Sequence, residues 1–209
     1  MPAIVLRAVF LGSLDVFDGA MAAVAAPSRV CVLATAAAFR GPSAAIEEVR
    51  QLLAPREVAG VGGPAIDRAS ANDPAVAAEV EASDLVILCD GAPLHARSVW
   101  RHSLLGEVLA HSTLLCVGAT GSVLGETMID PRGGAPTTGL GLFHEVVLSV
   151  PASAEQTSRT RGLLTHEILV ELGRRAVVAY DGRWRVVLDR DVVVTRAGAA
   201  IDLRLSDCQ

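Results

Sequence analysis

The sequence predicts an α/β fold built on a mostly parallel sheet, and two observations support that prediction. Short apolar runs alternate with segments of helical character along the first two thirds of the 209-residue chain. Within the runs, apolar residues follow one another without polar alternation, as expected for strands covered on both faces. Alternation of such strands with helices is typical of a parallel sheet joined by crossover connections.

Five apolar runs are the expected strands, and they span residues 4–11, 30–35, 58–61, 85–89 and 114–117. Between them we expect helices over residues 43–53, 74–82 and 98–110. The second helix has a clear start, because Asp73 can cap it and Pro74 suits its first turn.

The carboxyl ends of the strands are the expected location of any functional site. In open parallel sheets, ligands bind in the crevice beyond those ends. The chain leaves the predicted strands there in four loops, which follow Leu11, Thr35, Cys89 and Val117. We therefore expect these loops to meet and to form the site.

The last third of the chain has a different pattern. A helix is expected over 160–173, where five apolar residues recur near helical spacing: Leu163, Leu164, Ile168, Leu169 and Leu172. Strand-like runs follow at 176–180, 184–188 and 192–195, with Asp181-Gly182 as a hairpin turn between the first two. This predicts a C-terminal antiparallel β-hairpin appendage packed on the edge of the sheet. No linker or repeat interrupts the chain, so a single domain spanning residues 1–209 is expected.

Composition excludes several classes of function. The chain is 51% hydrophobic with a mean hydropathy of +0.44, yet no apolar stretch reaches the ~18 residues of a membrane span. The apolar N-terminus lacks a basic leader and a cleavage site, so it is expected to be the first strand rather than a signal peptide. A formal net charge of −5 argues against nucleic acid as a partner.

The types of reactive side chain exclude further classes of function. All 18 basic residues are arginine, which excludes Schiff-base chemistry through lysine. The four cysteines form no CxxC pair and suit small core positions in a cytoplasmic protein. No HExxH or paired ligand spacing is found, so no metal and no cofactor are expected.

The segment from Thr113 to Phe143 carries the strongest functional signal. The buried run 114–117 leads directly into Gly118-Ala119-Thr120-Gly121. This is the layout of a nucleophile elbow, the sharp strand-to-helix turn that presents a reactive side chain above a sheet. Ala119 stands at the tip of the turn and has no nucleophile.

Several segments in order carry a family resemblance. They are PLHARSV at 93–99, the elbow, MIDPRGGAPTTGLGL at 128–142 and DGRWRVV at 181–187. Together they resemble the cyanophycinase and dipeptidase E family of serine peptidases, over nearly the whole chain. The resemblance implies a flavodoxin-like three-layer α/β sandwich of the class I glutamine amidotransferase type, often a homodimer. It also implies hydrolysis of peptide bonds next to acidic residues, or of the isopeptide bonds of cyanophycin.

The departures from the family pattern fall on its catalytic positions. The family's G-S-S-A-G-A elbow, whose second serine is the nucleophile, aligns so that Ala119 takes the nucleophile's place. The histidine that follows GLGL by about nine residues in the family aligns with Pro151. A glycine triplet that helps to form the oxyanion hole becomes Cys89-Asp90-Gly91, and Asp90 there has the wrong charge for an oxyanion. We therefore expect a degenerate, catalytically inactive homologue that keeps the fold and a cleft for a binding, scaffolding or regulatory role.

An active enzyme with changed chemistry is the alternative. Cys116, Thr120 or Ser122 could replace the nucleophile of a hydrolase or amide- or acyl-transfer enzyme, and His95 or His144 could supply the base. Each also has a structural interpretation. Cys116 suits a buried strand, the two hydroxyls suit helix capping, and the histidines suit loop or helix-start positions.

Ligand contacts are expected from residues that the motifs bring to the cleft: Gly91, His95, Arg97, Gly118, Gly121, Asp130 and Arg132. Asp130 and Arg132 could instead fix the DPRGG loop through charge-assisted hydrogen bonds. The positive charges of Arg97 and Arg132 favour a small acidic or peptide-like ligand. The expected partner is a second copy or an active relative, in a homodimer or heterodimer, with neither nucleic acid nor a membrane involved.

Overall fold

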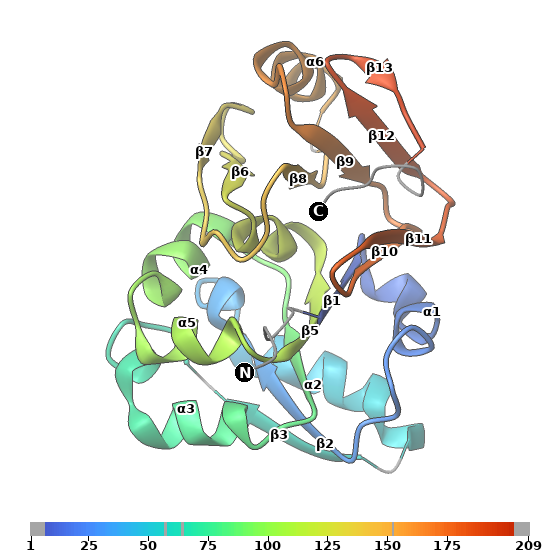
Figure 1. Cartoon of the computed structure of the whole chain (residues 1–209). Coiled ribbons are helices and arrows are strands. Elements are labelled where there is room, and N and C mark those ends of the chain that lie inside the picture. Colours follow the sequence, from blue (N-terminus) through green and yellow to red (C-terminus); the bar gives the residue numbers. More distant parts are fainter. Residues whose placement is uncertain (1–6, 57, 64, 152, 203–209) are drawn as a thin grey trace.

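A seven-stranded sheet forms the centre of the protein in a computed structural model that describes residues 7–56, 58–63, 65–151 and 153–202 (Figure 1). The strand order is β11-β10-β1-β5-β4-β2-β3. Five of these strands are parallel: β1 (Arg7–Leu11), β5 (Thr113–Val117), β4 (Leu85–Leu88), β2 (Arg29–Leu33) and β3 (Ala59–Gly63). The mostly parallel sheet expected from the sequence is confirmed; residues 4–6 of the first expected strand lie outside the described residues.

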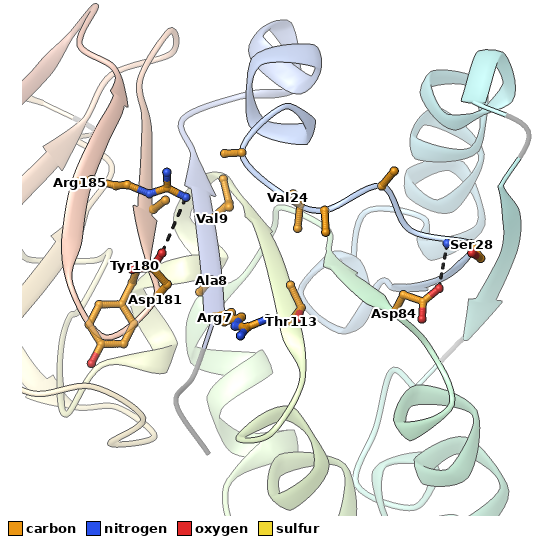
Figure 2. A pocket seen from close by; sticks show the side chains of 14 residues that line it. Arg7, Ala8, Val9, Val24, Ser28, Asp84, Thr113, Tyr180, Asp181 and Arg185 are labelled. Carbon is orange, nitrogen blue, oxygen red and sulfur yellow. Dashed lines mark hydrogen bonds and ion pairs between the residues drawn. The ribbon is translucent and has the colours of Figure 1, made fainter. Parts of the chain in front are cut away.

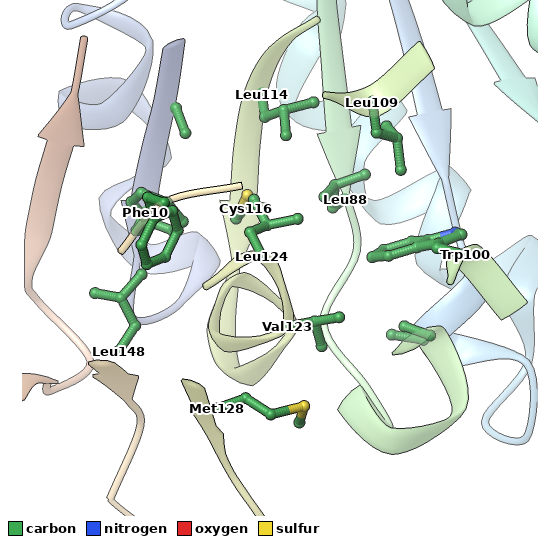
Figure 3. Packing of buried hydrophobic residues seen from close by; sticks show 14 of the residues in the cluster. Phe10, Leu88, Trp100, Leu109, Leu114, Cys116, Val123, Leu124, Met128 and Leu148 are labelled. Atoms are coloured by element: carbon green, nitrogen blue, oxygen red, sulfur yellow. The ribbon is translucent and has the colours of Figure 1, made fainter. Parts of the chain in front are cut away.

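Helices cover both faces of this sheet, which gives the three-layer sandwich. One face packs against α1 (Phe17–Met21) and α2 (Pro42–Leu53). The other packs against α3 (Pro74–Glu81), α4 (Pro93–Trp100) and α5 (Leu104–Leu109). Neighbouring residues of one strand point to opposite cores. Cys116 belongs to the same core as Phe10 and Trp100 (Figure 3). Leu115 and Val117 belong to the core covered by α1 and α2.

The expected helix over 98–110 is wrong, because the chain forms two helices there. Helix α4 ends at Trp100, His102 adopts a left-handed conformation with φ 56°, and Ser103 caps α5 by accepting a hydrogen bond from the Gly106 N–H at 3.1 Å. Arg68 stabilises the break, because its guanidinium donates to the carbonyls of Arg101 and His102 at the end of α4. The capping of α3 by Asp73 is confirmed, since its carboxylate accepts the N–H of Ala75 at 2.8 Å.

The expected helix over 160–173 is also wrong in its second half. Helix α6 (Ala154–Leu163) ends early, and Ile168–Leu172 is a strand, β9. It lies inside a second sheet of order β13-β12-β9-β8, with β13 (Ala199–Ala200), β12 (Val192–Arg196) and β8 (Val146–Ser149). All five residues of β9 are buried, and such a short apolar run has no periodicity that separates strand from helix.

The hairpin around Asp181-Gly182 is confirmed as β10 (Val177–Tyr180) and β11 (Trp184–Leu188). It extends the central sheet, because β10 pairs antiparallel with β1.

A further pair, β6 (Thr127–Ile129) and β7 (Pro136–Thr138), holds the DPRGG loop between its strands. Short 3₁₀ turns complete the chain at Leu14–Val16, Thr35–Ala37, Ala54–Arg56, Ser70–Asn72 and Gly118–Leu124 (η5). None of the helices within the described residues has the length and apolar character that crossing a bilayer requires.

Candidate functional site

Strand register brings the elbow and the Asp90 loop together. Cys116 of β5 lies opposite Phe10 of β1 and Leu88 of β4, so these parallel strands end at the same edge of the sheet. Strand β5 ends at the next residue, Val117, and η5 begins at Gly118. The loop after β4 begins one residue beyond Leu88. The carboxyl edge is therefore the place where the two motifs meet, as expected for a parallel sheet.

The Asp90 carboxylate is hydrogen-bonded to the elbow. Its Oδ1 accepts the backbone N–H of Ala119 at 3.0 Å and the N–H of Gly91 at 2.8 Å. Arg40, in the loop that follows β2, donates from Nη2 to the Asp90 carbonyl at 3.0 Å, and the same Nη2 lies 3.9 Å from Oδ2. One carboxylate oxygen thus occupies the point at which two N–H donors from different loops converge, next to a guanidinium.

Two glycines permit this close approach. Gly118 has φ 59°, and a Cβ on it would lie 2.3 Å from the Asp90 Cγ. Gly91 lies against the neighbouring loop, where a Cβ would be 2.0 Å from the carbonyl oxygen of Ala36. A side chain on Gly118 would force the Asp90 loop away from the elbow, and one on Gly91 would force that loop away from Ala36 in the loop after β2. A third glycine of the elbow, Gly121, packs against the core, because a Cβ there would be 2.6 Å from the ring of Phe10.

The candidate replacement nucleophiles all have structural contacts. Thr120 is fully buried and its hydroxyl donates to the Cys89 carbonyl at 2.9 Å. The Ser122 hydroxyl donates to the carbonyl of Ala119 at 2.8 Å within the same turn. Cys116 is fully buried in the core on one face of the sheet, and burial raises the pKa of its thiol well above the ordinary range. A buried thiol of raised pKa carries almost no thiolate at neutral pH.

The two candidate histidines contact other groups. His95, on α4, places Nε2 2.7 Å from the carbonyl oxygen of Ile66, so Nε2 must carry the proton. Its ring also meets the exposed ring of Phe39 edge-on at 4.7 Å. His144 is exposed, with Nδ1 3.0 Å from Oε2 of Glu126. Within the described part of the chain, no hydrogen bond joins either histidine to Cys116, Thr120 or Ser122.

The DPRGG loop is held by its own turn and by α6. The Asp130 carboxylate accepts the Arg132 N–H at 2.9 Å, and α6 binds the loop through Gln156, which donates to the Pro131 carbonyl at 2.9 Å. The side chain of Arg132 is exposed. Arg97 lies on α4 with its Nε buried and without a hydrogen-bond partner among the described residues.

Pro151 lies before α6 and is exposed. It lines a depression of about 480 Å³ on the second sheet, together with Arg161 and Glu171. Those two side chains form a half-buried ion pair, in which the Glu171 carboxylate is buried and the Arg161 side chain is 40% exposed; Nε of Arg161 lies 3.0 Å from Oε2 of Glu171. A proline here offers no proton acceptor to any neighbour.

A cavity of about 580 Å³ lies at the opposite, amino edge of the sheet (Figure 2). Its charged lining includes Arg7 and Asp84. On the side formed by the β10–β11 hairpin, Nη2 of Arg185 lies 3.9 Å from Oδ2 of Asp181. Neither histidine nor cysteine lines it. The described residues contain no group of three or more His, Cys, Asp or Glu placed to hold a metal ion. The carboxyl edge around Asp90 therefore remains the candidate site.

The sequence motifs point to Asp90, Gly91, Gly118 and Ala119, and they contain no signal for Arg40. The loop after Thr35 was expected to contribute to the site, and Arg40 stands just beyond the 3₁₀ turn that begins there. No motif singles out this arginine, because its role depends on the neighbouring strand order β4-β2.

Comparisons with known proteins agree with this architecture. No protein-family model matches the chain, and no curated protein matches it either. Among solved structures, it is similar to a peptidase from an acI-B1 Actinobacterium, with a TM-score of 0.72 and 18% identity over 94% of this chain and 96% of that one. It is also similar to a candidate Peptidase E protein from Listeria monocytogenes EGD-e, with a TM-score of 0.61 and 10% identity over 91% of this chain and 98% of that one. At these identities the likeness concerns the fold, and the chain has a peptidase-like α/β fold.

Proposed function

We propose that the protein is a catalytically degenerate homologue of cyanophycinase-type serine peptidases, which uses its carboxyl-edge site for a binding, scaffolding or regulatory role. The observation that carries this proposal is the contact between Asp90 and the elbow. The Oδ1 atom of Asp90 accepts the N–H of Ala119 at 3.0 Å and that of Gly91 at 2.8 Å. In an acyl-transfer enzyme, N–H groups at an elbow stabilise the negative oxygen that develops on the substrate.

The chemistry of the three altered positions supports the same conclusion. Ala119 has no group that can attack a carbonyl, and Pro151 has none that can accept a proton. A carboxylate at Asp90 adds a negative charge where negative charge would develop in the reaction. Removal of a single oxyanion donor costs an enzyme about 10²–10³ in turnover. Loss of nucleophile, base and free donors together is expected to abolish peptidase turnover.

The alternative, an active hydrolase or amide- or acyl-transfer enzyme that uses Cys116, Thr120 or Ser122, has weaker support. The Thr120 and Ser122 hydroxyls donate to backbone carbonyls, and the Cys116 thiol is fully buried with a raised pKa. A nucleophile is activated by a base within hydrogen-bond reach or by a lowered pKa. The contacts of these three residues favour structural roles.

We further propose that a small acidic or peptide-like ligand is recognised at this edge. The Arg40 side chain, which lies beside Asp90, is 64% exposed, so its positive charge is accessible to such a ligand. A homodimer, or a heterodimer with an active relative, would suit a scaffolding role. Light scattering of the purified protein, alone and mixed with such a relative, tests the assembly.

Turnover assays test the loss of activity. Purified protein is incubated with α-aspartyl and β-aspartyl dipeptides and with cyanophycin, and the released amino acids are measured by mass spectrometry. We expect no release above the buffer control, and no difference between the unmodified protein and the matched variant Cys116→Ala. Release that depends on enzyme concentration and disappears in Cys116→Ala would support the alternative. Release that persists in Cys116→Ala would contradict the proposal and direct attention to Thr120 and Ser122.

A further inference from the structure

We propose that the Asp90 carboxylate is an internal ligand of the site, and that a carboxylate from outside binds the same N–H groups only after the Asp90 side chain has turned away. This inference rests on the proposed function, because the N–H groups are free for such a role only if they no longer serve catalysis. The expected ligand is a carboxylate.

The binding position is built from separate parts of the chain. The N–H of Gly91 comes from the loop after β4, and the N–H of Ala119 comes from the elbow after β5. Both point to a single oxygen, the Oδ1 of Asp90. The guanidinium of Arg40, from the loop after β2, lies 3.9 Å from the other oxygen, Oδ2. Two convergent N–H donors beside an arginine match the two oxygens and the charge of a carboxylate.

The Asp90 side chain can leave this position without disturbing the core. Its side chain is 45% exposed, so rotation about its own bonds moves the carboxylate into water rather than into packed residues. Arg40 is bound to the carbonyl of Asp90 rather than tightly to its carboxylate, so the guanidinium stays in place when the side chain turns. The N–H donors and the guanidinium then remain to receive another carboxylate.

Competition with the Asp90 carboxylate sets the affinity of the site for an external carboxylate. A group tethered beside its binding position acts at an effective concentration on the order of millimolar or higher. An external carboxylate must exceed that concentration before it displaces Asp90. The unmodified protein is therefore expected to bind small carboxylates weakly, and a partner that also contacts other surfaces is needed to displace the side chain.

Acetate is a suitable probe, because it has the carboxylate and little else. The amide resonances of Gly91 and Ala119 are followed in ¹H–¹⁵N spectra of the full chain during titration with sodium acetate, against sodium chloride at matched ionic strength. In Asp90→Ala we expect both resonances to shift and saturate, with an apparent Kd at least about tenfold lower than in the unmodified protein. Asp90→Asn keeps an oxygen that can accept both N–H groups, so its response is expected to stay close to that of the unmodified protein.

Asp84→Ala is the matched control. The Oδ2 of Asp84 accepts the N–H groups of Ser28 and Arg29 at 2.8 and 2.9 Å, at the other edge of the sheet. Its removal also frees two N–H groups, but should leave the Gly91 and Ala119 resonances insensitive to acetate. If Asp90→Ala does not fold, Asp90→Gly replaces it with the same expected response.

Two results would overturn the inference. One is an equal acetate response in the unmodified protein and in Asp90→Ala, which would mean that Asp90 does not compete. The other is a folded Asp90→Ala whose Gly91 and Ala119 resonances do not respond. Both differ from failure of the proposed function, which is detected as peptide turnover by the unmodified protein.

Discussion

The Asp90 carboxylate lies in the space that a side chain on Gly118 would need: a Cβ on Gly118 would be 2.3 Å from the Asp90 Cγ. The two residues belong to the loops after β4 and β5, which are adjacent strands. Two features therefore favour glycine at position 118, the lack of space beside Asp90 and the left-handed φ of 59°.

Gly118→Ala is therefore expected to lower the free energy of unfolding by about 2–4 kcal/mol, from backbone strain and overpacking together. Urea denaturation measures this. Gly141→Ala is the matched control, since Gly141 has φ 75° but open space around it, and should cost only about 1 kcal/mol. Adding Asp90→Ala to Gly118→Ala should recover part of the loss. Equal costs at Gly118 and Gly141 would mean that the contact with Asp90 does not constrain the elbow.

The hydroxyl of Thr120 is expected to stabilise the fold rather than to react. Thr120→Val keeps the shape but leaves the Cys89 carbonyl, 2.9 Å from the lost hydroxyl, without that donor inside the protein. We expect a loss of about 1–3 kcal/mol in the free energy of unfolding, measured by urea denaturation. Thr113→Val, on the half-buried start of β5, should change stability by less than about 0.5 kcal/mol. A negligible effect at Thr120 would indicate a hydroxyl that is free for another use.

The Cys116 thiol is expected to resist alkylation in the native protein. The thiol is fully buried, so the reagent cannot reach it. Its pKa is raised, so almost none of it is thiolate at neutral pH. Iodoacetamide at neutral pH, with peptide mapping by mass spectrometry, should label Cys116 only after the protein is unfolded in guanidinium chloride. Cys208, a position outside the described residues, is mapped separately. Selective native labelling of Cys116 would instead favour the nucleophile hypothesis.

Stability is expected to fall at alkaline pH because of the buried thiols. Burial raises the pKa of Cys31 and of Cys89 to about 12, and raises that of Cys116 as well. An unfolded thiol ionises near pH ~8.5, so above that pH the unfolded state loses protons that the folded state keeps. Each thiol then removes about 1.4 kcal/mol of stability per pH unit until the folded pKa is reached.

Urea denaturation at pH 8 and pH 10 under reducing conditions measures this slope. Cys116→Ala should show a smaller decrease between the two pH values, by about one thiol's contribution. A stability that does not change over this interval would show that the thiols ionise equally in both states.

Much of the central sheet could be predicted from local sequence. Runs such as 85–89 and 114–117 are apolar at every position, as expected for strands covered on both faces, and their alternation with longer helical segments favoured strands over short buried helices. The second sheet could not be predicted in the same way. Ile168–Leu172 became a strand because β8 and β12 pair with it on both sides, and those partners lie at 146–149 and 192–196. Local spacing contains no information on such pairing.

Three chemical properties follow from the residue types alone: Ala119 cannot attack, the Pro151 side chain cannot accept a proton, and Asp90 brings a negative charge. The position of that charge depends on how the strands pair in the folded chain. Asp90 and Ala119 are 29 residues apart in the chain, and they meet because β4 and β5 are hydrogen-bonded neighbours that end at the same edge. The Asp90 oxygen accepts the N–H of its neighbour Gly91 through a local contact, and the pairing of β4 with β5 adds the N–H of Ala119 to the same oxygen.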